Sequence, residues 1–168
     1  MKRISVIAAF LIVTVFSAQA RKIGFINTDS VLVSIPDYTK AQESLKAQAS
    51  LFQQDLEKDL QYIDNLYTKY QEQKQYLNAA SCNAREQQII SLETALKEKQ
   101  EKYFGAEGEM TKRSEALLAP IKQRVNGVVS EYSKANGYSA ILDLAITPGL
   151  IYYDESEDIT RIIIDKLK

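Results

Sequence analysis

The sequence predicts a mainly α-helical protein in which a long antiparallel helical hairpin projects from a small α+β head. The hairpin is predicted by two apolar heptads that mirror one another. A strict seven-residue repeat keeps one apolar seam facing a partner helix, and two antiparallel helices of one chain need mirrored seams. The seam residues are Ala49, Leu56, Ile63, Tyr70 and Leu77 on the outward segment, and Ile89, Leu96, Tyr103, Met110 and Leu117 on the return segment. The head is predicted by a change to alternating apolar residues after Gly137.

The mirrored repeat also predicts which seam residues face one another. We expect Leu77 to pair with Ile89, Tyr70 with Leu96 and Ile63 with Tyr103, and so on down to Ala49 with Leu117. This pairing places the apex of the hairpin near residues 81–84, where small and polar residues suit a tight turn between helices.

The first twenty residues predict a cleaved signal peptide. Lys2 and Arg3 precede an apolar run that is short for a membrane-spanning helix, and small residues up to Ala20 supply a cleavage site. An uncleaved anchor is the less favoured alternative. Cleavage after Ala20 leaves 148 of the 168 residues and a net charge of −3, so the sequence predicts an exported chain with no stable membrane anchor. Nothing in it is basic enough to predict nucleic-acid binding.

After the signal peptide, Lys22 to Asn27 is expected to form a strand, and Thr28 or Asp29 is expected to cap a short helix that extends to Ile35. Pro36 then suits the first position of a long outward helix that extends to about Ala80.

The return helix is expected from about Ala84 to Lys134, ending at Gly137. Gly105, Gly108 and Pro120 predict kinks or hinges within it. For the two glycines, flexibility and close packing are equally good interpretations.

The last segment predicts a strand over residues 138–144, a turn at 147–149, a second strand over 150–153 and a terminal helix capped by Asp158. We therefore divide the chain into a signal peptide (1–20), a helical hairpin arm (38–134) and a body of three strands and two short helices (21–37 and 135–168).

The body is too small to be stable alone. It has 51 residues, and a domain below about 60 residues is marginal unless a disulfide, a metal or a partner stabilises it. Cys82 is the only cysteine, so no disulfide can form within the chain. Three strands would also leave open sheet edges. We therefore expect copies of the chain to share strands and core in a homo-oligomer, through these apolar residues of the body: Ile23, Phe25, Ile141, Leu142, Leu144, Ile151 and Tyr152.

Apolar side chains outside the seam are candidates for contact with other proteins, because aromatic rings on a polar surface can make many weak contacts. The candidates are Phe52, Tyr62, Tyr76 and Phe104. Leu60, Leu66 and Tyr67 are expected instead to thicken the seam.

The sequence contains little that could carry catalysis. It has no histidine, the commonest general base and zinc ligand, and one cysteine cannot form a redox pair. It also lacks a phosphate-binding glycine loop. We expect no enzyme activity, no metal and no cofactor.

The two ends of the mature chain resemble the Skp (OmpH-like) family of periplasmic chaperones. The similar segments are Lys22-Ile23-Gly24-Phe25-Ile26-Asn27, Asn136-Gly137-Tyr138-Ser139-Ala140-Ile141-Leu142-Asp143 and Leu150-Ile151-Tyr152-Tyr153. The central segments match only as coiled coil. The resemblance implies a homotrimer whose strands form a shared body, with three arms that hold unfolded outer-membrane proteins without ATP.

Familiar members of that family are strongly basic, whereas this chain is slightly acidic. We therefore do not expect this chain to have the lipopolysaccharide site of the family. Capture of client proteins is expected to depend more on aromatic and aliphatic contacts than on charge. A coiled-coil adaptor or spacer of the cell envelope, which binds one folded partner, is the alternative function.

Overall fold

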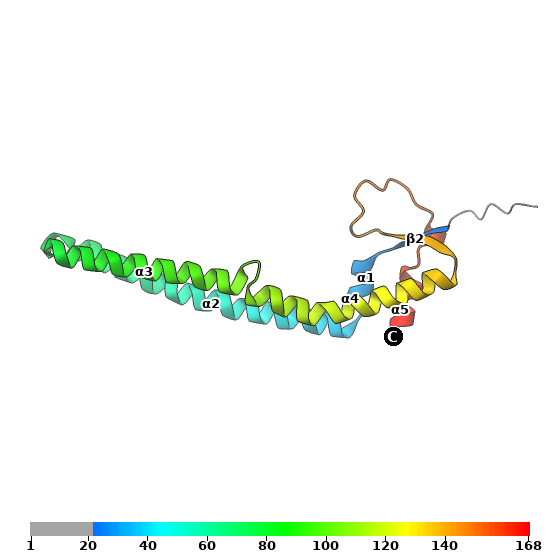
Figure 1. Cartoon of the computed structure of the whole chain (residues 1–168), viewed down its shortest axis with the longest axis horizontal. Coiled ribbons are helices and arrows are strands. Elements are labelled where there is room, and N and C mark those ends of the chain that lie inside the picture. Colours follow the sequence, from blue (N-terminus) through cyan, green and yellow to red (C-terminus); the bar gives the residue numbers. More distant parts are fainter. Residues whose placement is uncertain (1–21) are drawn as a thin grey trace, which may run out of the picture.

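The computed structural model describes residues 22–168, so the predicted signal peptide lies outside the described residues. The elements are β1 (Lys22–Ile26), α1 (Thr28–Val33), α2 (Pro36–Gln73), the 3-10 helix η1 (Lys74–Tyr76), α3 (Ala79–Phe104), α4 (Glu109–Ala135), β2 (Tyr138–Asp143), the 3-10 helix η2 (Glu155–Glu157) and α5 (Thr160–Leu167). Figure 1 shows α2 running beside α3 and then α4 in a long arm, with β1, α1, β2 and α5 gathered at one end as the body.

The long helix α2 begins at Pro36 and continues for 38 residues. Proline suits the first helical position because an N–H there has no partner within the helix, and Asp37 favours the positive end of the helix dipole. The short helix α1, which precedes α2, is capped by the side chain of Asn27 rather than by Thr28 or Asp29. This side chain accepts a hydrogen bond from the Ser30 N–H at 2.9 Å.

The apex of the arm lies at residues 74–78, and its predicted position at 81–84 is wrong. Asn78 caps α3 by accepting a hydrogen bond from the Ser81 N–H at 2.8 Å, so residues 81–84 already belong to the helix. The predicted pairing is wrong for the same reason. Tyr70 bonds to Glu86 rather than facing Leu96, and the Tyr103 ring stacks on Phe52 rather than facing Ile63.

The return segment consists of two helices, separated by a tight turn at residues 105–108 that Figure 1 shows as a bulge between α3 and α4. The Gly108 N–H donates to the Gly105 carbonyl at 2.9 Å, and the Thr111 hydroxyl donates to the same carbonyl at 3.2 Å. A Cβ on Gly108 would lie 2.8 Å from the Gly105 nitrogen. Close approach of the backbone therefore accounts for glycine at 108, and it occurs within the turn rather than between the two sides of the arm. Pro120 lies within α4, which continues through it.

Within residues 22–168, the body contains a two-stranded parallel sheet rather than the three strands predicted. β1 pairs with β2 on one side, and on the other side it meets the chain near Asp158, where the Ile159 N–H donates to the Phe25 carbonyl at 2.8 Å. The strand predicted over residues 150–153 is absent, since this segment pairs with no strand within the part of the chain that the structure describes.

The alternation predicted for β2 is also interrupted. Lys22 pairs with Tyr138 and Ile23 with Ala140, so an irregularity in register falls at Ser139. A bulge of this kind reverses the side on which the following residues point. Consequently Tyr138 and Ile141 both pack against the core of the body, whereas Leu142 is exposed.

The core of the body combines residues from β1, α1, α4 and α5. Its buried members are Ile26, Val31, Leu32, Ile35, Val125, Ile159 and Ile163. Val125 comes from α4, so the core reaches into the range that the sequence assigned to the arm. Burial of Ile159 and Ile163 holds α5 against the rest of the body.

Candidate functional site

The distal arm is held together by a small apolar cluster. Ile63, Tyr70 and Ile89 are buried there, with Leu77 and Leu96 packed against them. The other proposed seam residues, which are Ala49, Leu56, Tyr103, Met110 and Leu117, are each partly buried. None of the ten is exposed, so they offer little surface to another molecule.

A polar network lies in the middle of the arm. The Lys99 ammonium is 2.6 Å from Asp55 and 2.7 Å from Asp59, and the Tyr103 hydroxyl donates to Asp55 at 2.8 Å. The Tyr103 ring also stacks on Phe52, with centroids 3.9 Å apart. Because these contacts join particular residues of α2 and α3, they favour one register between the helices, which a repeating apolar seam alone does not.

Charge in this network shifts the pKa values of its members. The ammonium of Lys99 and the hydroxyl of Tyr103 both donate to Asp55, which lowers the pKa of that carboxyl. Conversely, the two carboxylates raise the pKa of Lys99. Nearer the apex, donation from Tyr70 and Lys74 lowers the pKa of Glu86. All of these shifts favour the ionised network over the neutral one at neutral pH.

The four predicted contact residues differ in exposure. Tyr76 at the apex and Tyr62 on α2 are well exposed, and Phe104 is exposed at the end of α3. Phe52 is partly buried, since one face is covered by Tyr103 and the Phe104 ring meets it edge-on with centroids 6.1 Å apart. The structure thus brings Phe52 and Phe104 together and leaves Tyr62 and Tyr76 apart from them.

Sequence reasoning missed part of the exposed apolar surface. Leu60 and Tyr67, expected to thicken the seam, are exposed, and so is Ile90, which was assigned no role. Only Leu66 of that group packs against the distal cluster. The sequence does contain a signal of this exposure. Leu60 and Tyr67 each follow a seam residue by four positions, and Ile90 directly follows the seam residue Ile89, so all three lie beside the seam rather than in it.

A second apolar surface lies on the body, in the irregular segment that follows β2. Ile151 is 99% exposed and Tyr152 is 82% exposed, and Ile146 is also largely exposed. The proposed body residues Ile23 and Leu142 are exposed too, whereas Phe25, Ile141 and Leu144 are partly buried. The Phe25 ring is in contact with Tyr153. Much of the apolar surface of the body is therefore left uncovered by its own chain.

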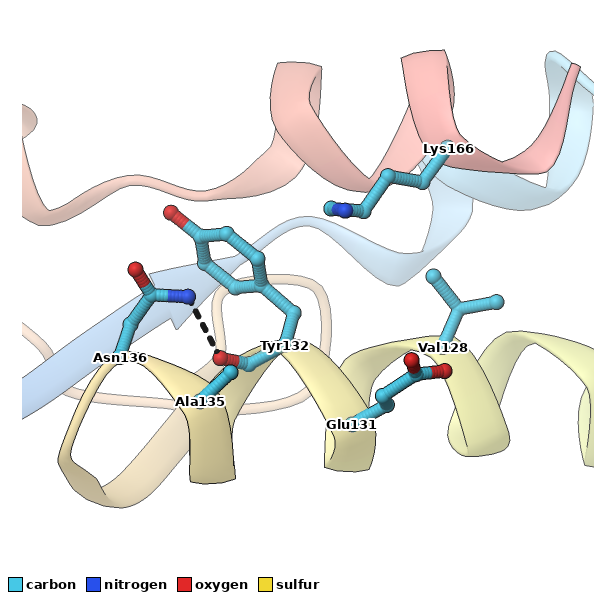
Figure 2. A pocket seen from close by; sticks show the side chains of 6 residues that line it. All are labelled: Val128, Glu131, Tyr132, Ala135, Asn136 and Lys166. Carbon is cyan, nitrogen blue, oxygen red and sulfur yellow. Dashed lines mark hydrogen bonds between the residues drawn. The ribbon is translucent and has the colours of Figure 1, made fainter.

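A shallow groove of about 290 Å³ separates the end of α4 from α5. Figure 2 shows Lys166 reaching toward the Tyr132 ring, with its ammonium 5.7 Å from the ring centroid, and Asn136 donating to the Tyr132 carbonyl at 2.8 Å. Residues 22–168 contain no cluster of side chains that could hold a metal ion. In the same range, no helix is both long and apolar enough to cross a membrane.

The sequence model of the family described as Outer membrane protein (OmpH-like) matches residues 22–167. The chain belongs to this family. The match to the OmpH-like family includes both the arm and the body, so neither part is an addition to the family fold. No curated protein matches the chain.

The OmpH-like family is the Skp/OmpH family of periplasmic chaperones, which bind unfolded outer-membrane proteins and oligomerise. It is not known as a family of enzymes. The parts of this chain that bear on such a role are the exposed apolar side chains of the arm and the uncovered apolar surface of the body.

Proposed function

We propose that this protein is an ATP-independent periplasmic holdase, which binds unfolded outer-membrane proteins between arms that project from the shared body of a homotrimer. The observation that carries the proposal is the arm itself, a long projection in which α2 runs beside α3 and α4, with its seam residues covered while other apolar side chains remain exposed along its sides. Such a surface can make many weak contacts with a polypeptide that has no fixed shape.

The body supports the oligomeric part of the proposal. Ile151 and Tyr152 are almost entirely exposed in the single chain, and the edge of β2 that faces away from β1 is open. An open strand edge beside apolar sequence is a template for pairing with another chain. We propose that residues 150–153 complete their strand against a second copy, with Ile23, Phe25, Ile141, Leu142 and Leu144 also contributing to the shared body.

Contacts with clients are proposed to come from the exposed side chains of the arm, among them Tyr62, Tyr76 and Phe104. Phe52 would contribute only the part of its ring that Tyr103 leaves free. The near balance of charge on the chain favours apolar contacts over electrostatic capture, and lipopolysaccharide is not proposed as a ligand.

The proposal is tested by diluting an outer-membrane barrel protein from urea into buffer and following its aggregation by light scattering. We expect a several-fold molar excess of the mature protein to suppress the scattering with no ATP added. Unchanged aggregation would contradict the holdase function. A stable stoichiometric complex with a single native envelope protein, without suppression, would instead favour the adaptor function.

A further inference from the structure

Four exposed apolar side chains form a stripe along one flank of the distal arm. On α2, Leu60 and Tyr67 follow the seam residues Leu56 and Ile63 by four positions each. On α3, Ile90 and Phe104 are two heptads apart and therefore lie on one side of that helix. Both helices expose these side chains substantially: Tyr67 in the last two turns of α2 is 52% exposed, and Ile90 near the middle of α3 is 51% exposed. We call these four residues the apolar stripe.

The two helices contribute to the same flank because Tyr67 and Ile90 line one shallow groove of about 370 Å³. Buried Tyr70 and Ile89 also line it, and Lys74 with Glu86 forms an ion pair at one end with an N–O distance of 3.3 Å. Since charges of both signs border the groove, it selects for apolar side chains rather than for a charged ligand.

The opposite flank has a different character. Asp55 and Tyr62 each precede a seam residue by one position, and a helix turns about 100° per residue, so they lie on the side opposite Leu60 and Tyr67. On that flank, Asp55 is already engaged by Lys99 and Tyr103. The arm thus has one flank that carries the ion network together with the exposed Tyr62, and another that carries the apolar stripe.

The amount of apolar surface indicates what the stripe binds. A stable interface between folded proteins buries about 800 Å² on each partner, around a contiguous apolar centre. Four half-exposed side chains offer roughly 400 Å² in all, and about 20 Å of helix separates Ile90 from Phe104. This surface is too small and too dispersed for a second folded copy, but it suits an unfolded chain whose apolar side chains dock one at a time.

We infer that the apolar stripe, rather than the arm as a whole, is the surface that holds unfolded polypeptide, and that the Tyr67–Ile90 groove takes individual aromatic or branched aliphatic side chains. The inference rests on the proposed holdase function and narrows it to one flank.

The test measures binding of a fluorescently labelled, urea-unfolded outer-membrane barrel protein to the mature chain by anisotropy. We expect Tyr67→Ser with Ile90→Ser to weaken binding at least tenfold, and Tyr62→Ser with Tyr76→Ser to weaken it less than threefold. Leu60→Ser and Leu51→Ser form a matched pair, because both leucines are exposed on α2 but Leu51 lies outside the stripe. Only Leu60→Ser should weaken binding. Circular dichroism confirms that each variant keeps its helix content.

Equal losses on the two flanks, or no loss from Tyr67→Ser with Ile90→Ser, would overturn the stripe while leaving the holdase function intact. Failure of the unsubstituted protein to bind would overturn both. A change of oligomeric mass in the Tyr67→Ser and Ile90→Ser variant would show that the stripe contacts another copy, and would also overturn the inference.

Discussion

Replacing Gly108 with alanine should destabilise the protein through a clash in the turn between α3 and α4. Gly108 has φ −75°, an angle that suits any residue, so backbone strain is not the reason. The reason is space: an added Cβ would lie 2.8 Å from the Gly105 nitrogen, 2.9 Å from its oxygen and 3.0 Å from the Tyr103 oxygen. These are backbone atoms, which cannot move aside as a flexible side chain can.

Overpacking of this kind costs about 2 kcal/mol, and the melting temperature should fall by roughly 6 °C in a chain of this size. The matched control is Gly127→Ala in the middle of α4, where an added Cβ would meet nothing within 4 Å. That change should stabilise the protein by about 1 kcal/mol, since alanine favours a helix interior over glycine. The assay is thermal unfolding followed by circular dichroism. A Gly108→Ala variant as stable as the original would refute the reasoning, because it would mean that the turn opens freely.

Three further predictions concern the body core, the arm and the oligomer. Ile163→Ala should cost about 3 kcal/mol in urea unfolding, because the side chain is fully buried; a loss below 1 kcal/mol would contradict this packing. The lowered pKa values of Asp55 and Glu86 mean that their contribution to stability is present above pH 4–5 and is lost as pH falls through the lower folded-state values. Helix content at 222 nm should therefore decrease below about pH 4, and Lys99→Met should reduce that dependence. Finally, Leu142→Asp should reduce the mass measured by light scattering to that of a monomer, and an unchanged mass would exclude a shared core at this position.

The sequence predicted the helical arm better than it predicted the register of the arm. An apolar seam repeats on average every 3.5 residues, so two mirrored seams match equally well after one helix slides by a few such steps. The choice among registers depends on particular polar contacts, such as Asn78 capping α3 and Lys99 meeting Asp55 and Asp59. These contacts are visible in the sequence only as ordinary polar residues, which is why the apex was placed too late in the chain.

The error in the body has a different origin. Residues 150–153 have the composition of a strand, but a strand forms only by pairing, and in the single chain this segment pairs with no strand even though the outer edge of β2 is open. The candidate contact residues were limited in the same way. Composition identified Tyr62, Tyr76 and Phe104 as exposed, but the position of Ile90 opposite Tyr67 depends on the register that the sequence left open.

The parallel pairing of β1 with β2 has a consequence for the order of folding. The hydrogen bonds from Thr28 to Asp143 join residues 115 positions apart, and closing so long an unstructured loop is entropically costly and slow. The arm occupies that interval, and because it is a hairpin it returns the chain to the place where it started. Once the helices of the arm have packed against one another through local contacts, β1 and β2 are already neighbours. The arm therefore acts as an internal template for the body, and substitutions that loosen its seam should slow formation of the sheet even though they lie far from it.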